Sequence, residues 1–487
     1  MIEQKIDALQ QYRAGIVGID HHIETPYGKK KLVYSDWIAS GRLYKPIEDR
    51  IINDIGPLVA NTHSESSTTG RAMTYAYHKA QHIIKRHVNA NSDDVIITTG
   101  TGMTGALSKL IRILGLKLPE WMQGKISLDQ KDKPVIFVTH MEHHSNQISW
   151  LETIADVVVI PPAEDLTVST ENLESSLTDY ADRTIKIGAF TACSNVTGIK
   201  TRYHELAKIM HEHDGICLVD FAASAPYVNI DMHPEDSLCS LDGIFFSPHK
   251  FLGGPGASGV LIFNKKLYKN TIPDEPGGGT VTWTNPWGGR RYFDDIEQRE
   301  DGGTPGFLQA IRSALCIQLK EEMGVERIES VEKHLVTRFI DGLKKIPSIK
   351  VLADDQYDRI GAISFYSDEM HFNLMVKLLN DRFGIQVRGG CSCAGTYGHY
   401  LLHVDEHYSQ TLTKKIDEGD LSQKPGWIRT SIHPTTTINE IDFILDSIEK
   451  VTANVQEWRK DYKYDVKSNE FFHHLEPNME ALMDNWF

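Results

Sequence analysis

Residues 245–256 read Phe-Phe-Ser-Pro-His-Lys-Phe-Leu-Gly-Gly-Pro-Gly. The apolar run that leads into them, from Gly243 to Phe246, is typical of a buried strand. It stops at Ser-Pro and is followed by a His-Lys pair, a glycine-rich turn and a second apolar run at 258–263. The stretch therefore predicts two buried strands joined by a turn that carries Lys250.

Lys250 has two interpretations. Burying an ammonium group is costly, so a lysine at the end of a buried strand is normally neutralised or used covalently. A desolvated lysine is a nucleophile that forms a Schiff base with an aldehyde. The plainer interpretation is a surface lysine in a loop, because lysine is rarely buried. This stretch alone leaves both interpretations open.

Composition excludes several classes of partner. The 487 residues carry a formal net charge of −15, which argues against nucleic acid and anionic membranes as main partners. No apolar run is long enough to span a bilayer, and the first residues lack the pattern of a signal peptide. Four of the six cysteines are scattered, which is typical of buried thiols in a reducing compartment. We therefore expect a cytoplasmic protein with no nucleic-acid or membrane partner.

Apolar runs recur along the middle of the chain, with helix-like patterns between most of them. They lie at 95–97, 135–138, 157–160, 185–190, 216–219, 244–246 and 260–263. Alternation of fully apolar strands with helices is typical of a mostly parallel sheet that is covered on both faces. We predict an α/β fold, in which ligands bind beyond the carboxyl ends of the strands.

Polar residues follow these runs directly. They are the turn Thr98–Gly105, the segment His140–Asn146, Asn195, Asp220, and Ser247 with His249 and Lys250. Small and hydroxyl residues at a helix N-terminus present N–H groups to a phosphate, although no Walker sequence follows here. Each residue alone is a weak signal, and a lone histidine is more often structural. As a set they supply what pyridoxal phosphate needs: a lysine, a carboxylate for the ring nitrogen, a flat side chain and phosphate ligands.

Five short motifs lie on these segments and just beyond them. They are Ser247-Pro248-His249-Lys250, Glu142-His143-His144-Ser145-Asn146, Cys193-Ser194-Asn195-Val196-Thr197-Gly198, Val219-Asp220-Phe221-Ala222-Ala223 and Gly303-Thr304-Pro305. The sequence resembles the class V aminotransferase family of fold-type I pyridoxal phosphate enzymes, from about Tyr34 to about Ile448. Within it, the chain is most similar to Suf-type cysteine desulfurases and to the sulfurase domain of molybdenum cofactor sulfurases.

The resemblance implies a role for each matched residue. Lys250 would form the Schiff base, His143 would stack on the ring as a second catalytic residue, and Asp220 would pair with the ring nitrogen. Asn195 would lie near the ring hydroxyl and the substrate. The phosphate ligands implied are Gly102, Met103, Thr104, Ser247, His249 and Thr304. In the family this threonine reaches the phosphate of the partner subunit, which implies a homodimer.

Two motifs extend the resemblance into the C-terminal part. Trp427-Ile428-Arg429-Thr430-Ser431 is similar to the segment whose arginine grips the substrate carboxylate, a task that suits a guanidinium fork. Residues 387–395, Val-Arg-Gly-Gly-Cys-Ser-Cys-Ala-Gly, resemble the loop that bears the catalytic cysteine of Suf-type desulfurases. Cys393 falls on that cysteine, with Arg388 as a further substrate ligand. The Cys-x-Cys form is closer to the molybdenum cofactor sulfurases.

The cysteine pair has alternatives of its own. Cys391 and Cys393 could be half of a metal site with His399 and His403, or they could be structural thiols. No second close Cys or His pair with ligand spacing occurs, so we predict no metal. The flanking glycines favour an exposed, reactive thiol, whose thiolate form Arg388 would stabilise.

The resemblance also implies an organisation into domains. We expect an N-terminal segment at 1–33 that packs on the small domain, a large domain with a seven-stranded sheet at 34–314, and a smaller α+β domain at 315–487. A polar insertion at about 403–424 is expected to form a lid or a flexible surface excursion. An aromatic-rich tail after residue 450 would dock on the body or on a partner. Ala223 and Gly105 stand where the family has Gln and Glu.

The prediction for function follows from the resemblance. We expect a cysteine desulfurase-like enzyme that converts L-cysteine to L-alanine and leaves a persulfide on Cys393, from which an acceptor protein could take the sulfur. The alternatives are another class V enzyme, such as an aminotransferase, lyase or epimerase on a small amino acid, or a pyridoxal phosphate-binding protein without turnover.

Overall fold

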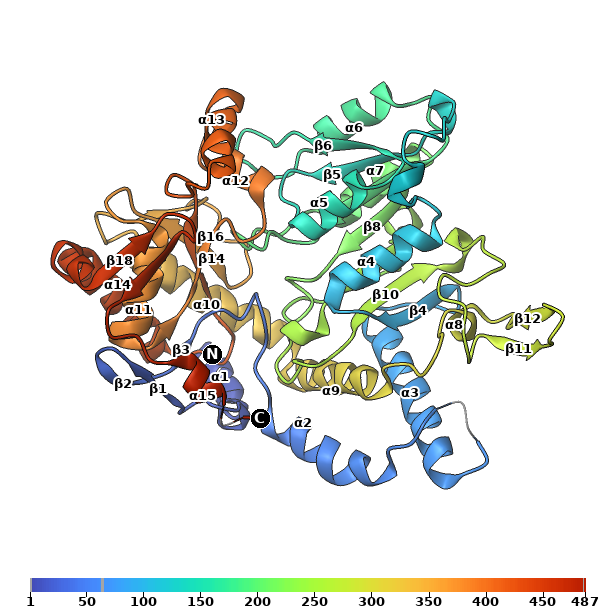
Figure 1. The fold of residues 1–487 in the computed structure, drawn as a ribbon, viewed down its shortest axis with the longest axis horizontal. Helices are drawn as coiled ribbons and strands as arrows, with labels where there is room; N and C mark the ends of the chain where they lie inside the picture. The colour runs from blue at the N-terminus through green and yellow to red at the C-terminus, as the bar shows by residue number, and fades with distance from the viewer. Residues whose placement is uncertain (1, 63–64, 485) are drawn as a thin grey trace. The chain divides into compact units, whose positions relative to one another are not determined.

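The computed structural model describes residues 2–62, 65–484 and 486–487. These residues form two compact units (Figure 1). The sheet unit comprises Ala39–Ser194 and Lys200–Ile328, and the terminal unit comprises the chain up to Ile38, Asn195–Ile199 and Glu329–Phe487. The sheet unit ends after Ile328, whereas the predicted large domain ends at residue 314, because helix α9 (Phe307–Met323) packs against helix α3 (Thr68–His87) of the sheet unit.

A seven-stranded sheet forms the centre of the sheet unit. In spatial order its strands are β4 (Asp94–Thr99), β10 (Gly259–Asn264), β9 (Gly243–Phe246), β8 (Ile216–Asp220), β7 (Lys186–Thr191), β5 (Val135–Thr139) and β6 (Asp156–Ile160). Only β10 runs antiparallel to its neighbours among these seven, and the pairs from β9 to β6 are parallel. The predicted fold class, a mostly parallel α/β sheet, is confirmed.

Both faces of this sheet are buried, which explains why its strands read as unbroken apolar runs. In β10, Leu261 and Phe263 pack into a cluster with helix α4 (Gly102–Ile113), while Val260 and Ile262 are also fully buried. Successive side chains of a strand point to opposite faces, so both faces of β10 are covered. Burial of each such side chain stabilises the fold by roughly 1.5–3 kcal/mol.

The remaining elements of the sheet unit are helices and one hairpin. They are α2 (Lys45–Arg50), α3, α5 (His144–Leu151), α6 (Thr170–Asp179), α7 (Tyr203–Glu212), α8 (Ile296–Arg299), α9, and the strands β11 (Val281–Thr284) and β12 (Arg290–Tyr292). Helix α3 begins where the side chain of Ser67 caps the N–H of Gly70, and its last turn is basic, as the helix dipole favours. Figure 1 shows the β11–β12 hairpin extending away from the central sheet, close to α8.

A four-stranded antiparallel sheet forms the core of the terminal unit. Its strands, in spatial order, are β13 (Lys350–Val351), β14 (Ala362–Tyr366), β17 (Trp427–Ser431) and β16 (Arg388–Gly390), accompanied by helices α10 (Val325–Leu343), α11 (Phe372–Phe383) and α14 (Ile438–Trp458). Helix α14 begins with a capping box of Thr437 and Glu440. Its buried positions, among them Ile441, Ile444 and Ile448, recur at helical spacing along one face.

The two ends of the chain also belong to the terminal unit. The elements here are α1 (Ile2–Gln10), β1 (His22–Thr25), β2 (Gly28–Lys31), β3 (Val33–Tyr34), β15 (Ile385–Gln386), β18 (Tyr462–Asp465), β19 (Glu470–His473) and α15 (Met479–Met483). Strand β3 pairs in parallel with β15, which ties the N-terminal segment to this unit. In the aromatic tail, Tyr462 donates to Asp381 of α11 at 3.0 Å, whereas Trp486 and Phe487 are exposed.

The polar insertion predicted at about 403–424 is largely helical. Helix α12 (Gly395–Leu401) precedes it, and helix α13 (Glu406–Asp417) lies within it. The side chain of Asp405 caps α13 by accepting from the N–H of Tyr408 at 2.7 Å. Across the described ranges, no helix has the length and hydropathy that crossing a membrane requires.

Candidate active site

The predicted cofactor residues of the sheet unit gather at one edge of the central sheet. Strands β4, β5, β7, β8 and β9 run in the same direction, so their carboxyl ends lie along the same edge. The residues that end or follow these strands are Gly102, Met103 and Thr104 after β4, His143 after β5, Asp220 at the end of β8, and Ser247, His249 and Lys250 after β9. This is the edge at which parallel α/β sheets bind ligands.

The turn before α4 packs directly on the segment after β9. Gly102 has φ +67°, and a Cβ there would lie 2.7 Å from Ser247 Oγ, so only glycine fits without displacing Ser247. The N–H of Met103 donates to Ser247 Oγ at 2.8 Å. Burial, assisted by the charge of Lys250, lowers the pKa of His249 to about 4, which keeps its imidazole neutral at physiological pH. A helix N-terminus, a hydroxyl and a neutral imidazole thus form a cradle suited to phosphate.

The two predicted phosphate threonines have protein partners. Thr104 Oγ1 lies 2.7 Å from Ser145 Oγ, which joins α4 to α5. Thr304 Oγ1 donates to Asn61 Oδ1 at 3.2 Å within the sheet unit. Both side chains are exposed at the surface of this unit.

Asp220 is a buried carboxylate near a lysine. It is 4% exposed, and its Oδ1 accepts from the N–H of Ala222 at 2.7 Å. Burial raises the pKa of Asp220 to about 6, and the charge of Lys250 opposes that rise. A carboxylate so placed favours a protonated nitrogen in any heterocycle that binds beside it.

His143 directly follows a buried glutamate, Glu142. His143 caps α5, and its Nδ1 accepts from the N–H of Ser145 at 3.1 Å, so a neutral ring carries its proton on Nε2. Glu142 accepts from Thr139 Oγ1 at 2.7 Å and from the N–H of Thr191 at 2.8 Å, which links β5 to β7. Burial raises the pKa of Glu142 to about 8. No role for Glu142 was predicted from the sequence.

Arg429 of the terminal unit is buried in strand β17. It is 2% exposed, donates from Nη2 to Asp36 Oδ1 at 2.8 Å, and donates from Nη1 to the backbone oxygen of Asn195 at 3.0 Å. Among the described residues its Nε has no hydrogen-bond partner, and neither does Oδ1 of the buried Asn195. Burial lowers the pKa of Arg429, while the charges of Asp36 and Cys393 oppose this.

Asp36 is the residue of this cluster that sequence reasoning missed. Its other oxygen lies 3.7 Å from Nε of the half-exposed Arg388, so one carboxylate serves both predicted substrate arginines. Asp36 lies almost 400 positions before Arg429, and nothing in the local sequence pairs them. Asp36 lies just after the short strand β3 (Val33–Tyr34).

The cysteine turn consists of Cys391, Ser392, Cys393 and Ala394. The N–H of Ala394 donates to the oxygen of Cys391 at 3.0 Å, and Ser392 and Cys393 have φ +51° and +58°. Buried Ser392 is held from two sides. Asn195 Nδ2 donates to its oxygen at 2.7 Å, and Trp427 Nε1 donates to its Oγ at 3.1 Å. Cys393 is exposed and Cys391 is half-buried.

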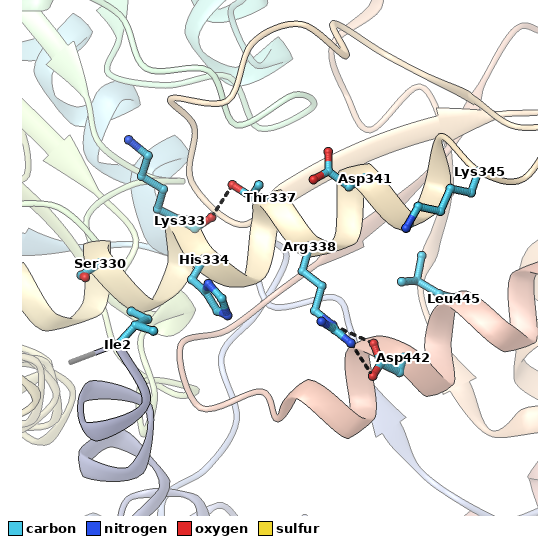
Figure 2. A pocket seen from close by; sticks show the side chains of 11 residues that line it. Ile2, Ser330, Lys333, His334, Thr337, Arg338, Asp341, Lys345, Asp442 and Leu445 are labelled. Atoms are coloured by element: carbon cyan, nitrogen blue, oxygen red, sulfur yellow. Dashed lines mark hydrogen bonds and ion pairs between the residues drawn. The ribbon is translucent and has the colours of Figure 1, made fainter.

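A separate cavity of the terminal unit lies away from the predicted site residues. It has a volume of about 640 Å³ and is lined by residues of α10 and α14 together with Ile2 and Lys345. Figure 2 shows the ion pair of Arg338 and Asp442 at its wall, and none of the predicted site residues lines it. In the part of the chain that the structure describes, no group of three or more His, Cys, Asp or Glu residues could hold a metal ion.

Comparisons with known proteins agree with this geometry. Residues 33–444 match the family described as aminotransferase class-V. The chain belongs to the class-V aminotransferase family. It is 30% identical over 367 residues to a probable cysteine desulfurase of Halalkalibacterium halodurans, covering 74% of this chain and 84% of that protein. A probable cysteine desulfurase of Staphylococcus epidermidis is 27% identical over 377 residues, covering 76% and 85%.

Solved structures support the fold. A cysteine desulfurase from Thermococcus onnurineus superposes with a TM-score of 0.70 at 23% identity, covering 87% of this chain and 95% of that one. The cysteine desulfurase CsdA from Escherichia coli gives a TM-score of 0.70 at 21% identity, covering 91% and 98%. The predicted family and its fold-type I architecture are therefore confirmed. This family uses pyridoxal phosphate, so its members share one type of cofactor chemistry.

Proposed function

We propose that the protein is a pyridoxal phosphate-dependent cysteine desulfurase, which converts L-cysteine to L-alanine and keeps the sulfur as a persulfide on Cys393. The observation that carries this proposal is the exposed Cys393 on a turn fixed beside a buried arginine, in a chain of this family. An exposed thiol near a guanidinium is the setting in which cysteine reacts as a thiolate. The relatives named above are called cysteine desulfurases, which agrees with it.

The residues of the sheet unit fit the cofactor. The N-terminus of α4, which the Met103 N–H holds against Ser247 Oγ, suits a phosphate group. Asp220 would hold the ring nitrogen, His143 the ring face and Lys250 the aldehyde carbon. When bound, the cofactor supplies an electron sink for the bonds of the substrate α-carbon.

The predicted substrate-binding and catalytic residues each have a defined task in this proposal. Arg429 binds the substrate carboxylate, for which its buried Nε is a donor without a protein partner in the described structure, and Arg388 assists at the surface. Asn195 orients the substrate through its buried side chain. Lys250 accepts and returns a proton at the α-carbon. The thiolate of Cys393 attacks the substrate sulfur, so that a sulfur–sulfur bond forms while the carbon–sulfur bond breaks.

The proposal includes partners. We infer a homodimer in which Thr304 of one chain contributes to the phosphate site of the other, an acceptor protein that takes sulfur from Cys393, and a cytoplasmic location. The exposure of Thr304 and its position in the Gly303-Thr304-Pro305 motif support the first of these.

The test is to incubate the yellow holoprotein with L-cysteine and a reducing thiol, and to quantify alanine and sulfide together. Equal amounts are expected from the parent. In Cys393→Ala, both products should fall by at least about 10³-fold while the visible cofactor band stays, because only the nucleophile is lost. Cys239→Ala, at a half-buried thiol of the sheet unit, is the control and should match the parent. Undiminished sulfide from Cys393→Ala would refute the assignment of the nucleophile. Transfer of the amino group to an added keto acid would favour an aminotransferase instead.

A further inference from the structure

We propose that Cys391 is a second catalytic thiol, which releases sulfur from Cys393 by forming a disulfide with it. This inference rests on the proposed function, since it concerns the fate of the sulfur that Cys393 has received. With this step the enzyme releases its sulfur as hydrosulfide without an acceptor protein. A dithiol then reduces the disulfide between Cys391 and Cys393.

The backbone of the cysteine turn keeps the Cα atoms of Cys391 and Cys393 close together. Ser392 has φ +51°, and the Cys391 oxygen to Ala394 N–H hydrogen bond closes a tight turn around it. The left-handed region mirrors helical geometry, in which Cα atoms two residues apart are separated by roughly 5.4 Å. Disulfides usually join Cα atoms that are about 4.4–6.8 Å apart. The expected Cα separation is thus within the range of disulfides, and because side chains two residues apart diverge in helical geometry, the exposed Cys393 must rotate toward Cys391 for the bond to form.

The turn is fixed through the residue between the thiols. Ser392 is 6% exposed, and its oxygen and its hydroxyl are both bonded, to Asn195 and to Trp427. Its two neighbours are the accessible ones, because Cys393 is exposed and Cys391 is half-buried. Anchoring the middle residue leaves both flanking sulfurs free to react while it limits how far the loop can move. A merely structural role for the pair does not require this pattern.

The other cysteines are differently placed. Cys193, Cys217 and Cys316 are buried, and burial raises the pKa of the last two thiols. Cys239 is half-buried in the sheet unit, where its Sγ donates to Asp236 Oδ2 at 3.6 Å, and burial together with this carboxylate raises its pKa. Cys393, in contrast, interacts electrostatically with Arg429. Cys391 is the thiol that shares a turn with the proposed persulfide.

The proposed step is balanced in atoms and electrons. The thiolate of Cys391 attacks Sγ of the Cys393 persulfide, the bond from that Sγ to the terminal sulfur breaks, and hydrosulfide leaves. The two cysteines are oxidised to a disulfide, and the terminal sulfur receives the two electrons. A small-molecule or protein dithiol then reduces the disulfide and restores both thiols for the next turnover.

The first arm of the test needs neither cofactor nor substrate. The protein is treated with less than one equivalent of an aromatic disulfide reagent that releases a coloured thiolate, and the protein mass is recorded. In the parent, Cys391 should displace the group attached to Cys393, so two coloured thiolates appear per reagent and the protein loses two hydrogens. Cys391→Ser should release one thiolate and keep the aromatic group. Cys239→Ser is the matched control and should behave as the parent.

The second arm uses the holoenzyme with one equivalent of L-cysteine and no reducing thiol. The parent should give alanine and sulfide equally and should lose two hydrogens. Cys391→Ser should release at least about tenfold less sulfide for each alanine formed and gain the mass of one sulfur atom, because its persulfide persists. An unchanged visible cofactor band shows that this variant is folded.

The two proposals fail in different ways. A stable aromatic adduct on the parent, or equal sulfide release from Cys391→Ser, would overturn the role of Cys391 and leave the desulfurase proposal intact. Absence of alanine from the parent overturns the desulfurase proposal, and with it the reaction assigned to Cys391, even if the first arm shows a reactive dithiol.

Discussion

The edge of the central sheet and the cysteine turn both position reactive side chains, but they do so in opposite ways. Asp220, Ser247 and Lys250 stand within a few residues of buried strands, and their positions follow from strand pairing. The cysteine turn is short, with only Cys393 fully exposed, and it is held by Asn195 and Trp427, which come from distant parts of the chain. The first arrangement is stabilised by a large core, and the second by a few hydrogen bonds.

The free energies that stabilise the cysteine turn and the sheet edge differ in size. Two consecutive non-glycine residues in the left-handed region cost about 1–2 kcal/mol each. The turn bond and the two bonds to Ser392 return roughly 0.5–1.5 kcal/mol each. These terms nearly cancel, so the cysteine turn keeps its shape only while its partners are present. The sheet edge has no such balance, because each buried strand side chain contributes roughly 1.5–3 kcal/mol.

The largest expected effect comes from Asp220→Asn at the sheet edge. Alanine production should fall by roughly 10²–10³-fold, because the negative charge beside the cofactor nitrogen is removed. The apoprotein should not be destabilised at neutral pH. The folded-state pKa of Asp220 is raised to about 6 by burial, so its stabilising contribution is complete below about pH 4 and is lost as pH rises through 6. At pH 7.5 we expect the variant to unfold in urea with a free energy equal to the parent or about 1 kcal/mol higher.

Asp242→Asn is the matched control for that prediction. Asp242 is equally buried, but hydrogen bonds from His211 and Lys266 outweigh its burial and lower its pKa. Neutralising it should reduce the free energy of unfolding by about 1–3 kcal/mol while alanine production per folded molecule stays unchanged. If both variants lost stability alike, Asp220 would be a structural carboxylate and not one kept for a ligand.

The second prediction concerns the cluster beside the cysteine turn. Asp36→Ala leaves the buried Arg429 without its carboxylate, and removal of one partner of a buried pair typically costs about 3 kcal/mol or more. Urea unfolding of the apoprotein measures the loss. Asp442→Ala removes an equally close ion pair with Arg338, but that pair is almost half exposed and should contribute less than about 1 kcal/mol. Similar losses in the two variants would mean that Asp36 is not the residue that compensates the charge of Arg429.

The contrast also explains what could be predicted from the sequence. All seven strands of the central sheet, and the polar residues that follow them, were predicted because a buried parallel strand leaves an apolar run that ends abruptly. Lys250 and Asp220 could be recognised for the same reason. The family resemblance added the cysteine loop and Arg429, whose local sequences carry motifs but no geometry.

The rest could not be predicted because it depends on long-range contacts. No local pattern reveals that Asp36 pairs with Arg429, or that Trp427 donates to Ser392. The left-handed backbone of Ser392 and Cys393 could not be predicted either. Glycine is the usual sequence signal for positive φ, and neither residue is glycine. The polar composition of residues 403–424 suggested a flexible excursion, yet the segment contains the capped helix α13. Its capping residue, Asp405, was the overlooked signal.

The smallest expected effect tests the strain in the turn directly. Ser392→Gly and Ser392→Ala both remove the hydroxyl that accepts from Trp427, so both should lose stability. Glycine adopts φ +51° without steric penalty and alanine does not, so the glycine variant should be more stable than the alanine variant by about 1 kcal/mol. At Ser330, within helix α10, the order should reverse by a similar amount, because glycine weakens a helix relative to alanine. The sign of the difference at residue 392 is therefore the informative quantity. Alanine equal to or better than glycine at 392 would mean that the turn relaxes out of the left-handed region in solution, and the disulfide geometry inferred for Cys391 and Cys393 would lose its basis.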